Sequence, residues 1–319
     1  MPRIQSLFIL RSLCGCLLLL TLWGQSRGEE IVLGNGKIEV AVDPAKGRIM
    51  HLSLPGLENL LWINPDAEKH FEEHGWQQWG GDRMLVTPIA LWPQIYGSSR
   101  PDPEVNDLPW EVLEKGDAYV RLRSAQSEVL GVQVERMIQL VEGEAVVRQS
   151  YVVRKIAESP IPVHVWTLTH FPVQGTIWMN IAEDTLHNGI RPLRNFFIGR
   201  QYVEGRLTYP EADRVEISMP DEHPIKVGTF GGWIAWKNDG FLFWIEAEWN
   251  RDGLYFDGSN LQIYINPRPG GFIEVESQSP TRYLEVGESV EFETRMGIED
   301  VSAEERASVK KVLQGLQGE

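Results

Sequence analysis

The chain has 319 residues, of which 42% are hydrophobic and 24% are charged, and its formal net charge at pH 7 is −15. An acidic surface repels the phosphate backbone, which argues against nucleic acid as a partner. The same self-repulsion favours solubility, and the length is sufficient for one large β domain or two small ones.

The N-terminus has the three parts of a secretory signal in their usual order. Arg3 and Arg11 provide the positive charge, residues 13–23 are apolar, and Ser26-Arg27-Gly28 forms a small-residue cleavage pattern. The apolar part is shorter than the roughly 20 residues that a membrane-spanning helix needs. A cleaved signal over residues 1–28 is therefore favoured over a retained anchor.

Both cysteines, Cys14 and Cys16, lie in this segment and superficially resemble a lipid-attachment site. The longest apolar run follows Cys16, however, whereas it should precede such a site. Without these 28 residues, which carry three arginines and no acid, the net charge falls from −15 to −18 and no cysteine remains. We expect a secreted or periplasmic protein whose mature chain, residues 29–319, lacks disulfides and any membrane span.

The mature chain is a succession of short alternating runs separated by turn residues, which is typical of strands. The first hairpin is predicted where Asp43-Pro44-Ala45-Lys46-Gly47 joins residues 37–42 to 48–54, and a second where Asn238-Asp239-Gly240 joins two runs. The predicted later strands span residues 119–123, 129–140, 145–156, 163–171, 233–237, 241–249, 261–265, 272–278 and 289–298.

Helical periodicity is clear only at the C-terminus. Ser302 and Glu305 form a capping box, and the apolar residues that follow share one face: Val309, Val312, Leu313 and Leu316. Residues 66–74 are polar and fit either a short helix or a surface loop, while residues 97–109 contain too many prolines for a central strand. The predicted fold is all-β: one large antiparallel sandwich over residues 29–319, with a short C-terminal helix on the sheet edge.

Tryptophan is the first candidate for ligand contact, because 12 are present and an indole offers a broad apolar face with a polar edge. Trp76 and Trp79 lie in the glycine-rich segment GWQQWGGDR, where ligand contact and core packing are equally favoured. The tryptophans of the second hairpin are expected in the core; they are Trp233, Trp236, Trp244 and Trp249.

The segment GWQQWGGDR, residues 75–83, is a second candidate. Its paired glycines allow positive φ or a close approach of the backbone, and Asp82 beside Arg83 offers a carboxylate and a planar donor group. A ligand site and a turn held by an Asp–Arg pair explain these residues equally well.

Titratable residues on two predicted strands form a third candidate. Proton transfer to and from a sugar needs an acid and a base, and His170 and Glu276 would supply them if their strands were neighbours. Taken alone, His170 is more often a satisfied structural histidine. Glu276 and Glu274 alternate, so both project to one face of their strand.

Metal and cofactor chemistry find little support in the sequence. His70 and His74 are four residues apart, but an HExxH pattern and an obvious third ligand are missing, so a solvated polar face is the better interpretation. There is no GxSxG, phosphate loop or dinucleotide fingerprint. We expect no metal and no cofactor.

The order of motifs resembles the galactose mutarotase-like superfamily, in particular an uncharacterised bacterial branch. The similarity extends from GKIEVAVDPAKGRIMHLSLPGLENLLW through QWGGDR and HVWTLTHF to VGTFGGWIAWKNDG and IEVESQSPTRYLEVGESVEFETRMGI. The resemblance implies a β-supersandwich that binds sugars in an open cleft, and therefore a carbohydrate partner. It further implies that His170 and Glu276 correspond to the acid and base of aldose mutarotases, and that Gln278 follows the glutamate as in their Glu-Thr-Gln strand.

The sequence departs from that family at both catalytic strands. The Asn-His-Thr-Tyr-Phe-Asn run around the family histidine and the Pro-Asp-Ala-x-Asn after its glutamate are absent. The leading hypothesis is therefore an exported carbohydrate-binding protein in which Trp76, Trp79, Asp82 and Arg83 help to form the cleft. The alternatives are an aldose 1-epimerase-like enzyme using Glu276 as base and His170 as acid, and a non-catalytic structural cell-surface protein.

Overall fold

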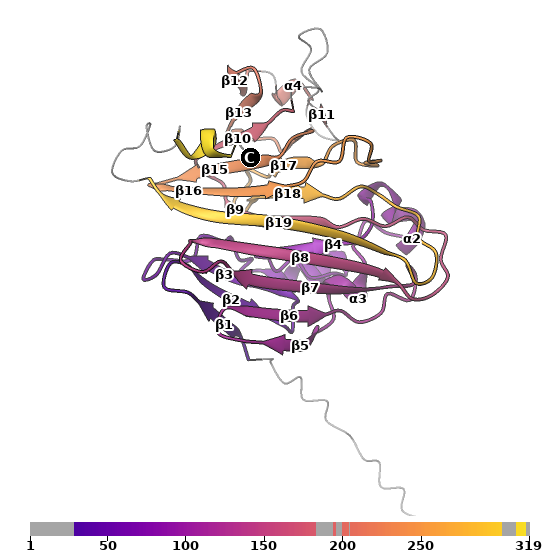
Figure 1. The fold of residues 1–319 in the computed structure, drawn as a ribbon. Coiled ribbons are helices and arrows are strands. Elements are labelled where there is room, and N and C mark those ends of the chain that lie inside the picture. The colour runs from indigo at the N-terminus through magenta and orange to yellow at the C-terminus, as the bar shows by residue number, and fades with distance from the viewer. Residues whose placement is uncertain (1–28, 183–193, 196–199, 204, 302–310, 317–319) are drawn as a thin grey trace, which may run out of the picture.

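Two large antiparallel sheets stack face to face in the computed structural model, and their strands cross the molecule in nearly the same direction (Figure 1). The structure describes residues 29–182, 194–195, 200–203, 205–301 and 311–316. The predicted signal at residues 1–28 lies outside this set. Among the described residues, no helix is long and apolar enough to cross a membrane.

The first sheet has nine strands, and its middle strands carry the site described below. In spatial order they are β1 (Ile31–Gly34), β2 (Glu39–Asp43), β3 (Arg48–Ser53), β4 (Asp82–Leu85), β9 (Trp166–Pro172), β18 (Phe272–Gln278), β17 (Leu261–Ile265), β14 (Ile225–Thr229) and β11 (Arg194–Asn195).

The second sheet has ten strands. In spatial order they are β12 (Leu207–Glu211), β13 (Arg214–Ser218), β10 (Thr176–Asn180), β15 (Trp233–Asn238), β16 (Phe241–Ala247), β19 (Ser289–Asp300), β8 (Val146–Lys155), β7 (Val132–Leu140), β6 (Tyr119–Arg123) and β5 (Glu111–Lys115). The helical elements are α1 (Ala67–His74), η1 (Ile89–Leu91), α2 (Trp92–Tyr96), α3 (Pro103–Asn106) and α4 (Arg200–Val203).

The all-β sandwich predicted from the sequence is confirmed, and the strands with clear alternation lie where expected. The second hairpin turns on Asp239 and Gly240, whose φ values of 32° and 92° match a two-residue turn with both central residues left-handed. The first hairpin turns with φ of 60° at Gly47. Of the two possibilities for residues 66–74, the helix is the one that forms, as α1.

The core lies between the two sheets and is built from the inward residues of each strand. Trp236 belongs to it, stacked on Phe171 with 4.3 Å between ring centroids. Trp233 and Trp244 are buried on the opposite face of the ten-stranded sheet. There they pack with Leu313 of the C-terminal helix, whose described part is residues 311–315. That helix covers a sheet face and not an edge, which corrects the sequence-based expectation; its predicted capping box lies outside the described residues.

A cluster of polar side chains connects the two sheets within this core. Asp82 of β4 is fully buried and forms an ion pair with Arg136 of β7, on the other sheet. The second carboxylate oxygen of Asp82 accepts a hydrogen bond of 2.8 Å from Thr169 Oγ1. Arg136 also donates to Gln149, whose amide oxygen accepts a bond from Tyr151. A buried ion pair of this kind is stable only because its remaining donors and acceptors are satisfied.

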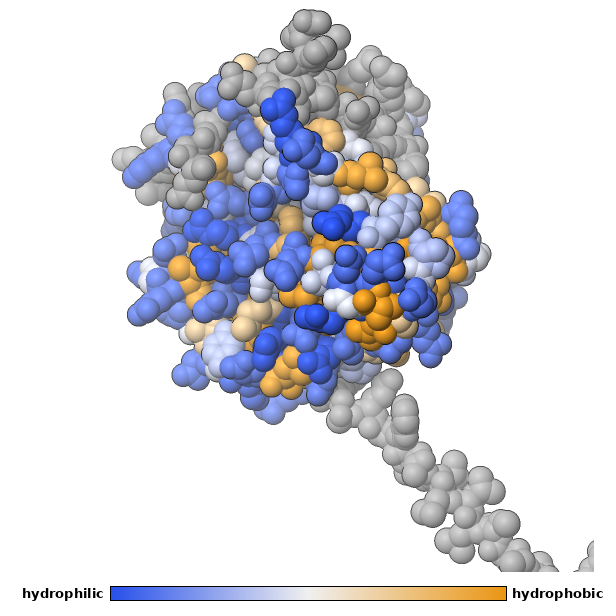
Figure 2. Space-filling model, turned by 45° about the vertical axis from the view of Figure 1, so that its right-hand side comes forward, coloured by the Kyte–Doolittle hydropathy of each residue, from blue (hydrophilic) through white to orange (hydrophobic). Residues whose placement is uncertain are grey.

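One face of the molecule is mostly hydrophilic. Figure 2 shows blue residues over most of the visible face, with smaller separate orange patches between them. This agrees with the acidic composition, and scattered apolar residues of this kind are normal on the surface of a folded protein.

Candidate functional site

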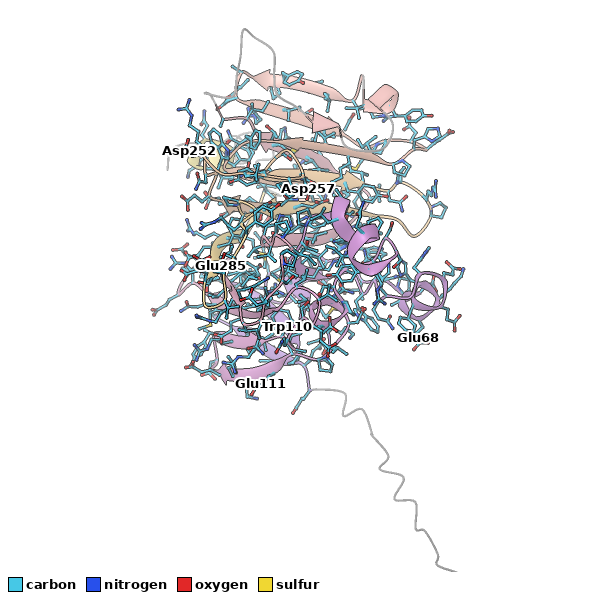
Figure 3. The ribbon with its side chains drawn as sticks, turned by 90° about the vertical axis from the view of Figure 1, so that its right-hand side faces the viewer. Glu68, Trp110, Glu111, Asp252, Asp257 and Glu285 are labelled. Atoms are coloured by element: carbon cyan, nitrogen blue, oxygen red, sulfur yellow. The ribbon has the colours of Figure 1, made fainter. Side chains whose placement is uncertain are left out.

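A cavity of about 620 Å³ opens on the outer face of the nine-stranded sheet, above β4, β9, β18, β17 and β14. Helix α1 forms its outer wall and stands away from the body of the sandwich, where Glu68 is labelled in Figure 3. Aromatic residues line much of the cavity: Trp62, Trp76, Trp92, Trp166, Tyr264 and Phe272. Polar residues converge between them: Asn64, Gln78, Arg83, Lys226, Asn266 and Glu274, with Lys69, His70, Glu73 and His74 from α1.

Strand pairing explains which side chains reach this face. Residues directly opposite each other in an antiparallel ladder project to the same side. Arg83 of β4 lies opposite Leu168, and His170 of β9 lies opposite Glu274 of β18. One step along β18, Glu276 lies opposite Leu168, so Glu274 and Glu276 share the face, as the alternation predicted.

The histidine that was predicted as a catalytic acid is paired with a different glutamate from the one expected. His170 Nε2 lies 3.0 Å from Glu274 Oε1, and His170 Nδ1 lies 2.7 Å from the carbonyl oxygen of Gly81. The ring is fully buried, whereas the Glu274 side chain keeps 12% of its exposure and lines the cavity. Glu274 is thus the carboxylate that links His170 to the cavity.

The pKa values of this pair follow from burial and proximity. Burial lowers the pKa of His170, and the hydrogen bond that His170 donates to Glu274 opposes that effect. Burial alone would raise the pKa of Glu274, but the hydrogen bond with His170 and the charges of His170 and Arg83 outweigh it, so the net shift is downward. Glu274 is therefore a carboxylate at neutral pH. Arg83 supports it from 3.7 Å and also lies over the ring of Trp76.

Glu276, the predicted base, lies on the same sheet face but is fully buried. Its Oε2 accepts bonds of 2.9 Å from both Trp166 Nε1 and Lys226 Nζ. Burial raises the pKa of Glu276 to about 7, in spite of the neighbouring Lys226 charge. His170 and Glu276 are thus neighbours on one sheet, neither on opposite walls of an open cleft nor on opposite sides of the sandwich.

Of the other predicted ligand residues, some line the cavity and others lie elsewhere. Trp76 and Arg83 line the cavity. Trp79 lies instead near Lys46, whose Nζ is 5.1 Å from its ring centroid, and Gln278 is buried and donates to Asp257 (labelled in Figure 3).

Asp82 requires a correction. Because adjacent residues of a strand point to opposite faces, Asp82 projects into the core while Arg83 projects to the cavity. The two neither form a joint ligand site nor hold a turn together. Asp82 pairs with Arg136 across the sandwich, and Arg83 donates to Asn106 Oδ1 at 2.9 Å.

The paired glycines of this segment serve both purposes that the sequence suggested. Gly80 and Gly81 have φ values of 76° and 71°. A Cβ at Gly80 would lie 2.3 Å from the carbonyl oxygen of Trp62, and one at Gly81 would lie 2.4 Å from that of Ile49. The positive φ and the close backbone approach both require glycine.

The two histidines of α1 line the outer wall. The rings of His70 and His74 are tilted by 50° with 4.5 Å between their centroids, and His70 Nδ1 lies 3.0 Å from the carbonyl oxygen of Trp76. Burial lowers the pKa of His70, so the ring is neutral at pH 7. In the described part of the chain, no group of three or more His, Cys, Asp or Glu residues is arranged so that it could hold a metal ion.

The sequence analysis did not single out several cavity residues: Trp62 and Lys226, and Gln78, which lies in the candidate segment GWQQWGGDR but was not itself predicted. Lys226 carried a usable signal, because a lysine at an inward or covered position of an apolar strand such as IKVGT demands a charged partner. Trp62 and Gln78 lie in loops, where no periodicity marks the side that faces a site.

Comparison with known proteins supports the fold and nothing finer. No protein-family model and no curated protein matches the chain. Among solved structures, a galactose mutarotase-like protein from Lactobacillus casei is similar with a TM-score of 0.57 and 12% identity, covering 85% of this chain and 100% of that one. A galactose mutarotase related enzyme from Lactobacillus acidophilus has a TM-score of 0.54 and 10% identity, covering 86% and 98%.

A candidate aldose 1-epimerase from Klebsiella pneumoniae has a TM-score of 0.60 and 13% identity, covering 88% of this chain and 82% of that one. These similarities extend over nearly the whole sandwich and both of its sheets. The protein described above has the galactose mutarotase-like fold.

Proposed function

We propose that the protein is exported and binds carbohydrate in the cavity on the outer face of the nine-stranded sheet. The observation that carries the proposal is the lining of that cavity, in which aromatic faces alternate with hydrogen-bonding groups. Its volume of about 620 Å³ lies in the usual range for small-molecule sites. The N-terminal sequence pattern supports export, although residues 1–28 lie outside the described structure.

The aromatic residues suit the apolar face of a sugar ring. Trp62 and Trp76 are partly exposed at the cavity, whereas Trp92 and Trp166 are buried in its wall. Trp76 is held in place on two sides, since Arg83 lies 5.3 Å from its ring centroid and His70 meets it edge-on at 4.5 Å. An indole fixed in this way presents its remaining surface at little entropic cost.

The polar residues suit sugar hydroxyl groups, which both donate and accept hydrogen bonds. Arg83 and Lys226 provide donors, and the ionised Glu274 provides an acceptor. Because Arg83 and Lys226 each have a carboxylate neighbour, the cavity carries little excess charge. This balance favours a neutral ligand over a strongly anionic one.

Isothermal titration against a panel of mono- and oligosaccharides tests the proposal, and two tryptophans of one segment supply the controlled comparison. Trp76→Ala should weaken binding of the best sugar about tenfold, because it removes a cavity-lining aromatic face. Trp79→Ala, outside the cavity, should leave the affinity unchanged. Absence of binding across the whole panel, or an equal loss in both variants, would contradict the proposal.

A second candidate function, an aldose 1-epimerase, is favoured by the 3.0 Å contact between His170 and a cavity-lining carboxylate. In this reaction a carboxylate takes the proton of the anomeric hydroxyl while an acid protonates the ring oxygen, so the ring opens, and reversal after rotation of the aldehyde gives the other anomer. The family resemblance assigns the acid role to His170, which is fully buried and contacts the cavity through Glu274, so its ring would have to move to reach a sugar. Glu276 is the base that the family resemblance implies, and Glu274 is the one that contacts His170.

Polarimetry on freshly dissolved α-anomers separates these possibilities. An epimerase should accelerate mutarotation above the buffer rate, and Glu276→Gln or Glu274→Gln should abolish the acceleration, depending on which carboxylate is the base. Wild-type protein that matches the buffer rate would exclude the enzyme but not the binding protein. A purely structural role is the third candidate, and the partial exposure of Trp62 and Trp76 counts against it.

A further inference from the structure

Gln262, on β17, lies directly opposite Glu276 of β18 and on the same sheet face. The two side chains are 1% and 0% exposed. Directly opposed residues of an antiparallel ladder have Cβ atoms about 4.5–5.5 Å apart, so their polar ends share one small region. Neither residue lines the cavity, but both lie next to it. The following outward residue of β17, Tyr264, lines the cavity, as do Trp166 and Lys226, which hold Glu276.

Two buried polar atoms in this region, one from each side chain, have no hydrogen-bond partner among the described residues: Gln262 Nε2 and Glu276 Oε1. A buried polar group without a partner costs about 1–3 kcal/mol, so a ligand group that pairs with such an atom gains favourable interaction energy. The arrangement is also asymmetric, because the other oxygen of the same carboxylate accepts two bonds, from Trp166 and Lys226.

The two atoms are chemically complementary, since the amide donates and the carboxylate accepts, yet they do not bond to each other. A hydroxyl group placed between them can accept from Gln262 and donate to Glu276 at the same time. A ketone or ether oxygen could satisfy only the amide, and an ammonium only the carboxylate. Hydroxyl groups are the groups in which carbohydrates are rich.

We propose that Gln262 and Glu276 form an inner subsite that binds one hydroxyl group of the sugar, with Gln262 as its specificity-determining residue. This inference rests on the proposed carbohydrate binding. It adds Gln262 to the binding residues and predicts that the site distinguishes sugars by the presence of one hydroxyl group. Entry requires the Lys226 side chain to shift, because it contacts Glu276 from the cavity side. A sugar that lacks the matching hydroxyl leaves both groups unpaired, as they are in the free protein, and therefore forgoes both hydrogen bonds.

The test compares wild-type protein with Gln262→Met, which keeps the size of the side chain and removes its amide. Gln139→Met, at an exposed position of β7 in the other sheet, is the control. Calorimetric titrations use D-glucose, D-galactose and the monodeoxy analogues of each. Thermal unfolding without sugar is measured for all three proteins.

We expect Gln262→Met to bind the better hexose about tenfold more weakly than wild type, and to bind one monodeoxy analogue, that lacking the matched hydroxyl, as well as wild type does. Without sugar, its melting temperature should equal or exceed that of wild type, because a buried amide without a partner has been removed. The control should match wild type in every measurement.

Three results would overturn the subsite. One is equal affinity of wild type and Gln262→Met for all sugars, while wild type still binds. Another is a clearly lower melting temperature of Gln262→Met with unchanged affinity, since the amide would then have a structural role filled by a permanent internal water. Wild-type protein that binds none of the sugars would overturn the proposed function, and this subsite with it.

Discussion

Arg136→Met should lower the free energy of unfolding by about 3–5 kcal/mol, the largest loss that we expect from a single substitution in this protein. The change leaves the carboxyl group of Asp82 without its charged partner between two sheets, where it is fully buried. The hydrogen bond from Thr169 cannot replace a full positive charge. Urea-induced unfolding at neutral pH, followed by tryptophan fluorescence, measures the loss.

Arg121→Met provides the matched control, because Arg121 lies on the neighbouring strand β6 and pairs with Glu114 at 3.3 Å on the surface. Both members of that pair are exposed, so its loss should cost less than about 1 kcal/mol. Double replacement of Arg136 and Asp82 by apolar residues should recover part of the stability. Equal losses in Arg136→Met and Arg121→Met would show that the core ion pair is not the strong element described here.

Lys226→Met should destabilise the protein strongly at pH 8 and only slightly at pH 5. The pKa of Glu276 is raised by burial to about 7 from an ordinary value of 4.5, so the folded protein holds Glu276 neutral at pH 5 and ionised at pH 8. The stability that this raised pKa contributes is fully present below about pH 4.5 and is lost as the pH rises through about 7. Removing Lys226 takes away the charge that stabilises the ionised form, which raises the pKa further.

The expected loss for Lys226→Met is therefore about 3 kcal/mol at pH 8 and below about 1 kcal/mol at pH 5. The double variant Lys226→Met with Glu276→Gln should lose this pH dependence, because no ionisable group remains at the pair. Lys115→Met, at an exposed position of β5, controls for the loss of a lysine. Denaturant unfolding at both pH values measures the effect, and an equal loss at pH 5 and pH 8 would refute the assigned role of Glu276.

The sequence predicted the sandwich well where one sheet face is buried, because alternation then records the fold directly. Strands β7, β8 and β19 show this. Strand β18 is buried on both faces, but its sequence also alternates, and the shared face of Glu274 and Glu276 followed from the same period of two. The region between residues 172 and 233 gave no comparable signal, and several of its strands were missed. Strand β12, for example, contains a proline and is largely exposed.

The pairing of His170 with a particular glutamate could not be predicted, because it depends on the register between β9 and β18. A shift of two residues would exchange Glu274 for Glu276 without changing which face either occupies. Nothing in a single strand records that register. The direction of Asp82 could not be predicted for a different reason. Its segment begins with two glycines and shows no alternation, so a strand was not expected there.

Helix α1 and the segment after it differ in how firmly they are attached, which bears on selectivity. The carbonyl of Gly81 accepts both the backbone N–H and the ring of His170, and Gly81 itself donates to Trp62. Helix α1, in contrast, buries only Ala67 and half-buries His70, and its other side chains are exposed. The sheet side of the cavity, the floor, is therefore held by several hydrogen bonds, whereas the α1 side, the rim, has few buried contacts and can adapt. A sugar residue on the floor would be chosen strictly, whereas further residues of a longer chain, reaching past α1, would be accepted with little discrimination.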